Sequence, residues 1–174
     1  PACGHNSVTR TFSDSLRKIR AKKESVELVR TTLSESVGKD DAEVTCRSII
    51  ETCISDGVVA FQKYCEGMYS RFGNAPFNAF QRLDQASSLW EKAVQKGFDA
   101  WLSPDELKKL AIIYQKRHLL AHNEGIVDER YIEKSGDATY KSEQRIVIKD
   151  KDIDFLLSAL QKLGLGIERA CENA

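Results

Sequence analysis

Arg117, His118 and His122 are the residues whose types and spacing best suit chemistry in this sequence. A histidine has a pKa near neutrality, so it can give or take a proton at physiological pH. An arginine carries a permanent positive charge that binds phosphate and stabilises negative charge in a transition state. These residue types together suit a reaction at a phosphate group, with a histidine moving the proton.

The same residues allow two other interpretations. Arginine and histidine can satisfy buried polar groups inside a packed domain, which would give them a purely structural role. Histidines four residues apart, as His118 and His122 are, can also bind one Zn²⁺ on one side of a helix. No third ligand stands at a recognisable spacing, so we predict no metal at these residues. The structural and catalytic interpretations both remain open at this point.

A predicted helix over residues 104–122 positions this group. Its apolar stripe consists of Leu107, Leu110, Ala111, Tyr114 and Ala121. At about 100° per residue, His118 is predicted to point into the middle of this stripe. Arg117 and His122 flank it, roughly 140° apart. Such a break in an apolar pattern is expected mostly at functional or strained sites.

Other segments show the same helical period. Residues 13–37 are predicted as a polar, basic helix. Apolar residues at helical spacing predict helices over 40–72, 78–96 and 104–122, and a last one from Asp150 or Asp152. The start at 104 is the clearest, because Ser103 and Glu106 form an S-x-x-E capping box around Pro104. The helical pattern breaks over 125–149, and 145–148 is predicted as a short strand or extended arm. We therefore predict an all-α antiparallel bundle of about five helices, with at most one short hairpin before the last.

Length and composition narrow the class of protein. A chain of 174 residues is the size of one domain. No apolar run approaches the ~20 residues that a membrane-spanning helix needs. The five cysteines are odd in number and scattered, unlike a secreted disulfide scaffold. We therefore expect reduced thiols in a cytoplasmic protein.

The charge composition says less about function than the length and the cysteine pattern do. The chain has 26 basic and 26 acidic residues, so a wholly basic protein that coats nucleic acid is excluded. One local run is basic, comprising Arg17, Lys18, Arg20, Lys22 and Lys23. Such a run is either a solvated helix face or a contact for RNA phosphates.

The opening residues suggest a second unit. Residues 1–5 read Pro-Ala-Cys-Gly-His, which matches the end of the C-P-x-C-G knuckle of a zinc ribbon. We expect residues 1–12 to be a linker or the remnant of a preceding ribbon, and residues 13–174 to be the helical domain. Zinc is expected only in such a ribbon, through Cys3, and no other cofactor is expected. Alternatively, Cys3 is a chance cysteine in a loose terminus.

The segment Arg117-His118-x-x-x-His122 resembles the R-[polar]-x3-H hallmark of the HEPN superfamily (higher eukaryote and prokaryote nucleotide-binding domains). The longer stretch from Arg117 to Asp137, R-H-L-L-A-H-N-E-G-I-V-D-E-R-Y-I-E-K-S-G-D, is similar to a bacterial subgroup in which an N-terminal zinc ribbon is expected. The resemblance extends over about residues 40–172.

This resemblance implies metal-independent cleavage of RNA by a homodimer, in which paired Arg/His motifs form one cleft. His122 would be the general base or acid, and Arg117 would bind the scissile phosphate. His118 would support them, and Asn123 would contact RNA or fix the His122 ring. The known roles of the family imply a bacterial defence or toxin–antitoxin system. An antitoxin protein would then be a further partner.

The roles of two residues after this motif stay open, as do two other functions of the chain. Asp128 and Tyr131 either line the cleft or are turn and packing residues. Many HEPN domains are non-catalytic, so the alternative function is an interaction or nucleotide-binding module. A third class, a zinc-ribbon regulator that binds DNA or RNA, depends on residues before Pro1.

Overall fold

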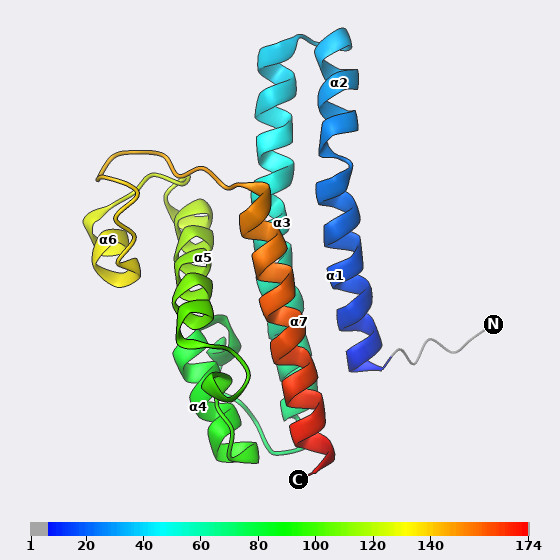
Figure 1. Cartoon of the computed structure of the whole chain (residues 1–174), viewed down its shortest axis with the longest axis vertical. Coiled ribbons are helices and arrows are strands. Elements are labelled where there is room, and N and C mark those ends of the chain that lie inside the picture. The colour runs from blue at the N-terminus through cyan, green and yellow to red at the C-terminus, as the bar shows by residue number, and fades with distance from the viewer. Residues whose placement is uncertain (1–6, 174) are drawn as a thin grey trace, which may run out of the picture.

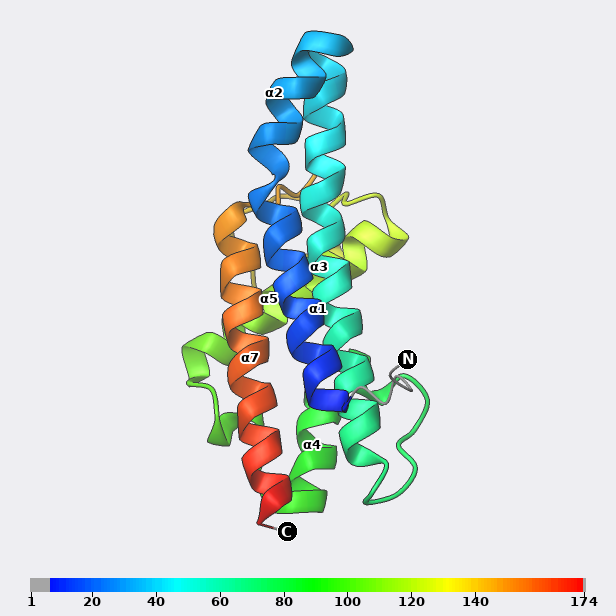
Figure 2. The same cartoon turned by 90° about the vertical axis from the view of Figure 1, so that its right-hand side faces the viewer.

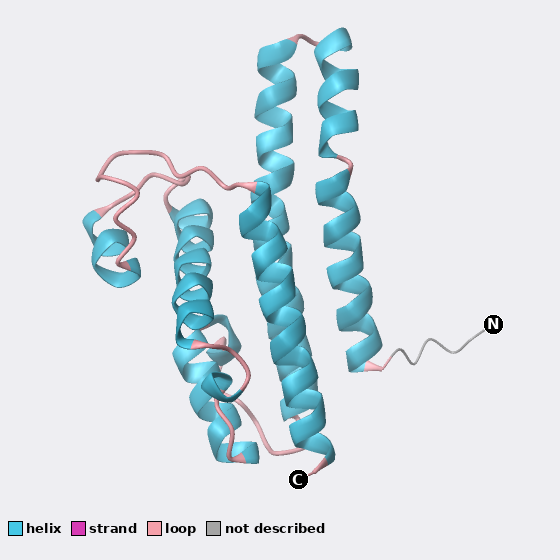
Figure 3. Cartoon of the chain, viewed as in Figure 1, coloured by secondary structure: helices cyan, strands magenta, loops and turns pink. Residues whose placement is uncertain are grey.

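The computed structural model describes residues 7–173, and these residues form an all-helical fold, as predicted (Figures 1 and 3). The α-helices are α1 (Val8–Glu24), α2 (Val26–Ser36), α3 (Lys39–Tyr69), α4 (Leu83–Val94), α5 (Pro104–His122), α6 (Glu129–Ser135) and α7 (Asp150–Glu172). Two short 3₁₀ turns, η1 (Ala79–Gln81) and η2 (Phe98–Ala100), flank α4. The seven α-helices within residues 7–173 exceed the predicted count of about five.

Four long helices make the bundle that positions the candidate site. In Figures 1 and 2, α1 and α5 run in one direction while α3 and α7 run in the other. α3 contacts both α1 and α7, and α5 contacts α3 and α7. The predicted antiparallel bundle is therefore confirmed. α2 and the first turns of α3 project beyond the other helices.

Apolar stripes account for the association of these helices. On α3 the apolar residues at helical spacing from Ile50 to Met68 are buried, and on α7 those from Ile153 to Ile167 are buried as well. Each buried Leu, Ile or Phe side chain contributes about 1.5–3 kcal/mol of transfer free energy. The long helices therefore owe their stability to packing rather than to intrinsic propensity.

The first predicted helix differs from the structure in two ways. It begins at Val8 rather than Ser13, and Phe12 is buried in the core. Residues 8–12, which we expected in a linker, therefore belong to the bundle; residues 1–6, including Cys3, lie outside the described part of the chain. The helix also breaks at Ser25, whose hydroxyl donates to the Lys22 carbonyl at 2.8 Å. Such side-chain bonds compete with helix continuation.

The capping box predicted at the start of α5 is confirmed. Ser103 Oγ accepts a hydrogen bond from the Glu106 amide at 3.3 Å, and Glu106 Oε2 accepts one from the Ser103 amide at 3.0 Å. The hydrogen bond from Lys162 on α7 is the main reason why the pKa of Glu106 falls to about 2. This end of α5 is thus fixed both by its own cap and by α7.

Residues 125–149 contain a helix where we predicted none. α6 begins at an Asp128 cap and ends at Gly136, whose φ of +60° suits glycine. The expected hairpin is reduced to a single antiparallel bridge between Ile126 and Arg145. Arg145 also donates two hydrogen bonds to Glu51 of α3, at 2.7 and 3.1 Å. The bridge and this ion pair hold the segment that carries α6 beside α5.

Candidate functional site

The C-terminal half of α5 carries the candidate residues, but not in the predicted orientation. His118 is exposed, which corrects the prediction that it points into the apolar stripe. Ile113, which the predicted stripe omitted, is buried, whereas Ala121 is exposed. At about 100° per residue, the buried face is therefore centred nearer Arg117 than His118. Arg117, and not His118, is directed toward the interior.

His118 and His122 lie together on the exposed side of α5. Their ring centroids are 4.6 Å apart, with an angle of 50° between the ring planes. Partial desolvation lowers the pKa of His118, and the neighbouring His122 lowers it further. At pH 7 a larger fraction of His118 is therefore neutral than of a free histidine. A neutral imidazole can accept a proton.

Three cations lie close enough to His118 to affect its protonation. The positive charges of Arg130, Lys134 and Arg117 also lower the pKa of His118. Arg130 and Lys134 are one helical turn apart on α6 and both are exposed. Neither residue was predicted as part of the site, because residues 125–149 were expected to lack a helix. The signal was present in the Asp128 cap and the Gly136 stop, which delimit α6.

A small pocket of about 50 Å³ lies beside His118, where α5 faces α6. Its lining includes Gln115, His118, Asp128, Arg130 and Tyr131. Its volume is close to that of one or two water molecules. The pocket therefore offers space for a small polar group next to the exposed imidazole, and not for a whole nucleotide.

Asp128 and Tyr131 line this pocket and also hold α6 in place. Asp128 Oδ1 accepts a hydrogen bond from the Tyr131 amide at 2.7 Å, which caps α6. The Tyr131 hydroxyl donates to Asp137 Oδ2 at 2.7 Å, and both residues are buried. Burial raises the pKa of Asp137, but hydrogen bonds from Thr139 and Tyr131 outweigh it, so that the net pKa is below its ordinary value. Both proposed roles, packing and lining, are thus compatible with the contacts of these two residues.

Asn123 ends α5 and shapes the turn after it. Its Nδ2 donates to the Ile126 carbonyl at 2.6 Å. The amide is therefore bound to backbone, and no hydrogen bond joins it to His122 in the described chain. Asn123 supports the site by fixing where the chain leaves α5.

Arg117 is half-buried and incompletely bonded. Its Nε is shielded from solvent without a hydrogen-bond partner among residues 7–173, as is the Tyr114 hydroxyl. Burial raises the pKa of Tyr114, while the charge of Arg117 acts against this, so the two side chains are near each other. A buried donor without a partner costs about 1–3 kcal/mol. Such unpaired buried groups are expected mostly at functional or strained sites.

Arg117 and His122 do not contact each other within one chain. No hydrogen bond joins them in the part of the chain that the structure describes, and they leave α5 in different directions. Residues 7–173 also contain no group of three His, Cys, Asp or Glu side chains placed to hold a metal ion. The structure thus brings together His118 and His122, with the cations of α6, and separates Arg117 from His122.

Comparisons with protein-family models, curated proteins and solved structures gave no match to this chain. Within residues 7–173, each helix is too short or too polar to cross a bilayer.

Proposed function

We propose that this chain is a metal-independent endoribonuclease of the HEPN type. The observation that supports it most is the adjacent pair of His118 and His122 rings, with the α6 cations Arg130 and Lys134 close enough to lower the pKa of His118. Positive charges attract the phosphates of RNA, and histidines can move protons beside them. Because the chain has no net charge, these cations are a local feature of the site rather than part of a generally basic surface.

The proposed reaction is attack by the ribose 2′-hydroxyl on the adjacent phosphorus. His118 suits the general base, because its lowered pKa keeps it neutral and able to accept the hydroxyl proton. The bond between phosphorus and the 5′-oxygen breaks, and His122 gives that oxygen a proton. Arg117 stabilises the extra negative charge on the phosphate oxygens. The products are a 2′,3′-cyclic phosphate and a 5′-hydroxyl.

The proposal includes a homodimer. Because Arg117 and His122 diverge within one chain, a complete site requires Arg117 of one chain to approach His122 of another. A two-fold axis near the end of α5 would create two such sites from the same surface. A stable interface of this kind buries at least ~1,200 Å² in total.

Single-stranded RNA incubated with the purified protein in EDTA tests this function. We expect cleavage of RNA but not of DNA, and 2′,3′-cyclic ends on the 5′ product. Arg117→Ala and His122→Ala should each lower the rate by ~10²-fold or more. Lys108→Ala removes an exposed positive charge from the first half of α5 and should leave the rate unchanged. Cleavage of DNA, or loss of activity in EDTA, would contradict the mechanism.

A non-catalytic interaction module is the second candidate function. The observation that favours it is the half-buried Arg117, whose position is compatible with a structural role. Under this alternative, the cations of α6 would bind a partner without any reaction. Absence of RNA cleavage, together with unchanged partner or RNA binding in His122→Ala, would favour the module over the nuclease.

A further inference from the structure

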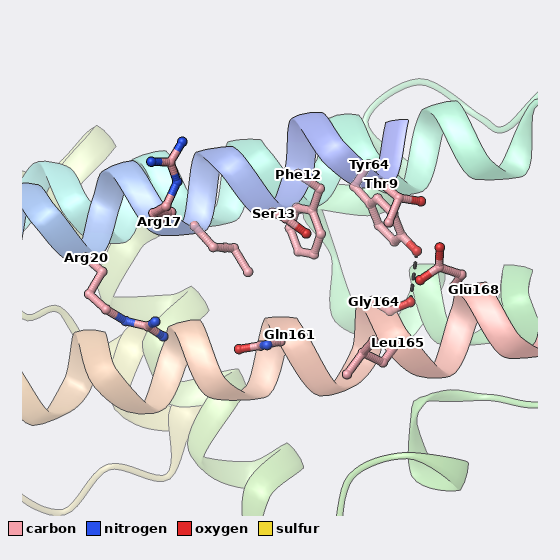
Figure 4. A pocket seen from close by; sticks show the side chains of 11 residues that line it. Thr9, Phe12, Ser13, Arg17, Arg20, Tyr64, Gln161, Gly164, Leu165 and Glu168 are labelled. Carbon is pink, nitrogen blue, oxygen red and sulfur yellow. Dashed lines mark hydrogen bonds between the residues drawn. The ribbon is translucent and has the colours of Figure 1, made fainter. Parts of the chain in front are cut away.

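A second cavity lies between α1 and α7, over α3, and no residue of α5 or α6 contributes to its lining (Figure 4). Its volume is about 250 Å³, five times that of the pocket beside His118, whose volume is about 50 Å³. This is near the lower end of the range for small-molecule sites, ~300–1,000 Å³. The candidate nuclease site makes no use of this cavity.

Two aromatic rings and the backbone of α7 form the floor of the cavity. The Phe12 and Tyr64 rings stack with centroids 4.5 Å apart, and the Tyr64 hydroxyl donates to the Gly164 carbonyl at 2.8 Å. A Cβ at Gly164 would lie 2.8 Å from the Phe12 ring, so glycine is needed for this close approach. The short side chains of Thr9 and Ser13 leave the space above the floor open. Larger apolar residues at these positions would have closed it.

A free positive charge marks one end. In Figure 4 the Arg20 side chain extends from α1 toward α7, near Gln161. Arg20 forms no ion pair within residues 7–173, whereas Lys22 and Lys23 of the same basic run pair with Asp56 and Asp154. Arg17, which also lines the cavity, pairs with Asp14, so within residues 7–173 the run leaves two cations unpaired, Arg20 at the cavity and Lys18 outside it. An anionic group is the chemistry that a guanidinium in this position would bind.

A negative charge marks the other end. Glu168 lies beside Tyr64 and Gly164 and forms no ion pair within residues 7–173. Gln161, at the Arg20 end, and Glu168 are two helical turns apart on α7, about 11 Å. Between them Leu165, with 46% of its surface exposed, presents an apolar side chain to the cavity.

We propose that this cavity binds an elongated small molecule with opposite charges at its two ends. Its anionic group would pair with Arg20, its apolar chain would lie on Phe12, Leu16 and Leu165, and its amino group would pair with Glu168. The chemical class is therefore an ω-amino acid or a similar dipolar molecule with a chain long enough to run along two helical turns of α7, about 11 Å. The site is independent of the proposed nuclease activity.

Three probes with the same chain length test the charge pattern. 8-Aminooctanoate, octanoate and octanedioate are titrated into ¹⁵N-labelled protein, and amide shifts are followed by NMR. We expect saturable shifts at Ser13, Arg20 and Leu165. 8-Aminooctanoate should bind about tenfold more tightly than octanoate, because a charge-assisted bond is added at Glu168. Octanedioate should bind more weakly than both, because its second carboxylate meets Glu168.

Matched variants separate specific recognition from general charge. Arg20→Gln should weaken all three probes by about tenfold or more, while Lys18→Gln, which removes an exposed charge outside the cavity, should not. Glu168→Gln should abolish the preference for 8-aminooctanoate, and Glu172→Gln should preserve it. No saturable shift with any probe at millimolar concentration would overturn the proposal. Equal effects of Arg20→Gln and Lys18→Gln, or equal affinity for the three probes, would overturn it as well.

Discussion

Two neighbouring cations on α5 should respond to the same substitution with opposite signs. Lys116 is 8% exposed and its Nζ lies 3.5 Å from Oδ2 of Asp152, which is also 8% exposed. Arg117 is half-buried, and its Nε has no partner in the described chain. We therefore compare Lys116→Met with Arg117→Met, since methionine keeps much of the volume of each side chain and removes its charge.

The expected magnitudes follow from what each change leaves behind. Lys116→Met leaves the buried Asp152 carboxylate without its cation, which typically costs about 3–5 kcal/mol. The Lys149 amide still donates to Asp152 at 3.1 Å, so we expect a loss of about 2–3 kcal/mol. Arg117→Met removes an unpartnered buried donor, so we expect no loss and a gain of up to about 1 kcal/mol.

Urea unfolding at one fixed protein concentration measures both free energies, because assembly would make stability concentration-dependent. The m-value of each variant should equal that of the parent chain. A loss of more than about 1 kcal/mol in Arg117→Met, similar to that in Lys116→Met, would refute the reasoning and give Arg117 a structural role.

Three further predictions concern pH, the α6 segment and helix packing. The pKa of His118 is lower in the folded than in the unfolded chain, so the unfolded chain takes up the proton more readily. The free energy of unfolding should therefore fall as the pH decreases from 7 through the folded pKa. In urea unfolding, His118→Gln should show a weaker pH dependence than the parent chain. Glu51→Gln removes the negative charge and one of the two oxygens that accept from Arg145, and it should cost at most about 1 kcal/mol. Hydrogen exchange around Ile126 should become faster, and unchanged exchange would contradict the anchoring role. Gly166→Ala should destabilise the fold by about 1–3 kcal/mol in thermal unfolding, because the added Cβ would lie 2.4 Å from the Trp101 ring. An unchanged Tm would contradict this prediction and show that the ring can move away.

Apolar periodicity and capping predicted the long helices well. The α3 and α7 stripes are buried, and the capping box at Ser103 has both of its hydrogen bonds. These signals are local, since each depends on residues within a few turns. The break at Ser25 could not be predicted in this way, because serine is tolerated inside helices and its competing hydrogen bond forms in only some of them.

The orientation of the candidate residues on α5 could not be predicted from the sequence. One omitted residue, Ile113, was enough to rotate the inferred buried face and to exchange the positions of Arg117 and His118. The contribution of Arg130 and Lys134 depends on α6 packing against α5, which is a tertiary contact. A seven-residue helix also has too few turns to show an apolar period.

A heterodimer of two inactive variants gives the most direct test of the central claim, that Arg117 of one chain and His122 of another form one RNA-cleaving site. Arg117→Ala and His122→Ala chains with different affinity tags are co-expressed, and the doubly tagged dimer is purified. One of its two sites keeps both residues, so RNA cleavage in EDTA should recover to about half of the wild-type rate, while each variant homodimer stays ~10²-fold slower. A heterodimer as slow as its parents, or a wild-type chain that remains monomeric or cleaves no RNA, would contradict the claim.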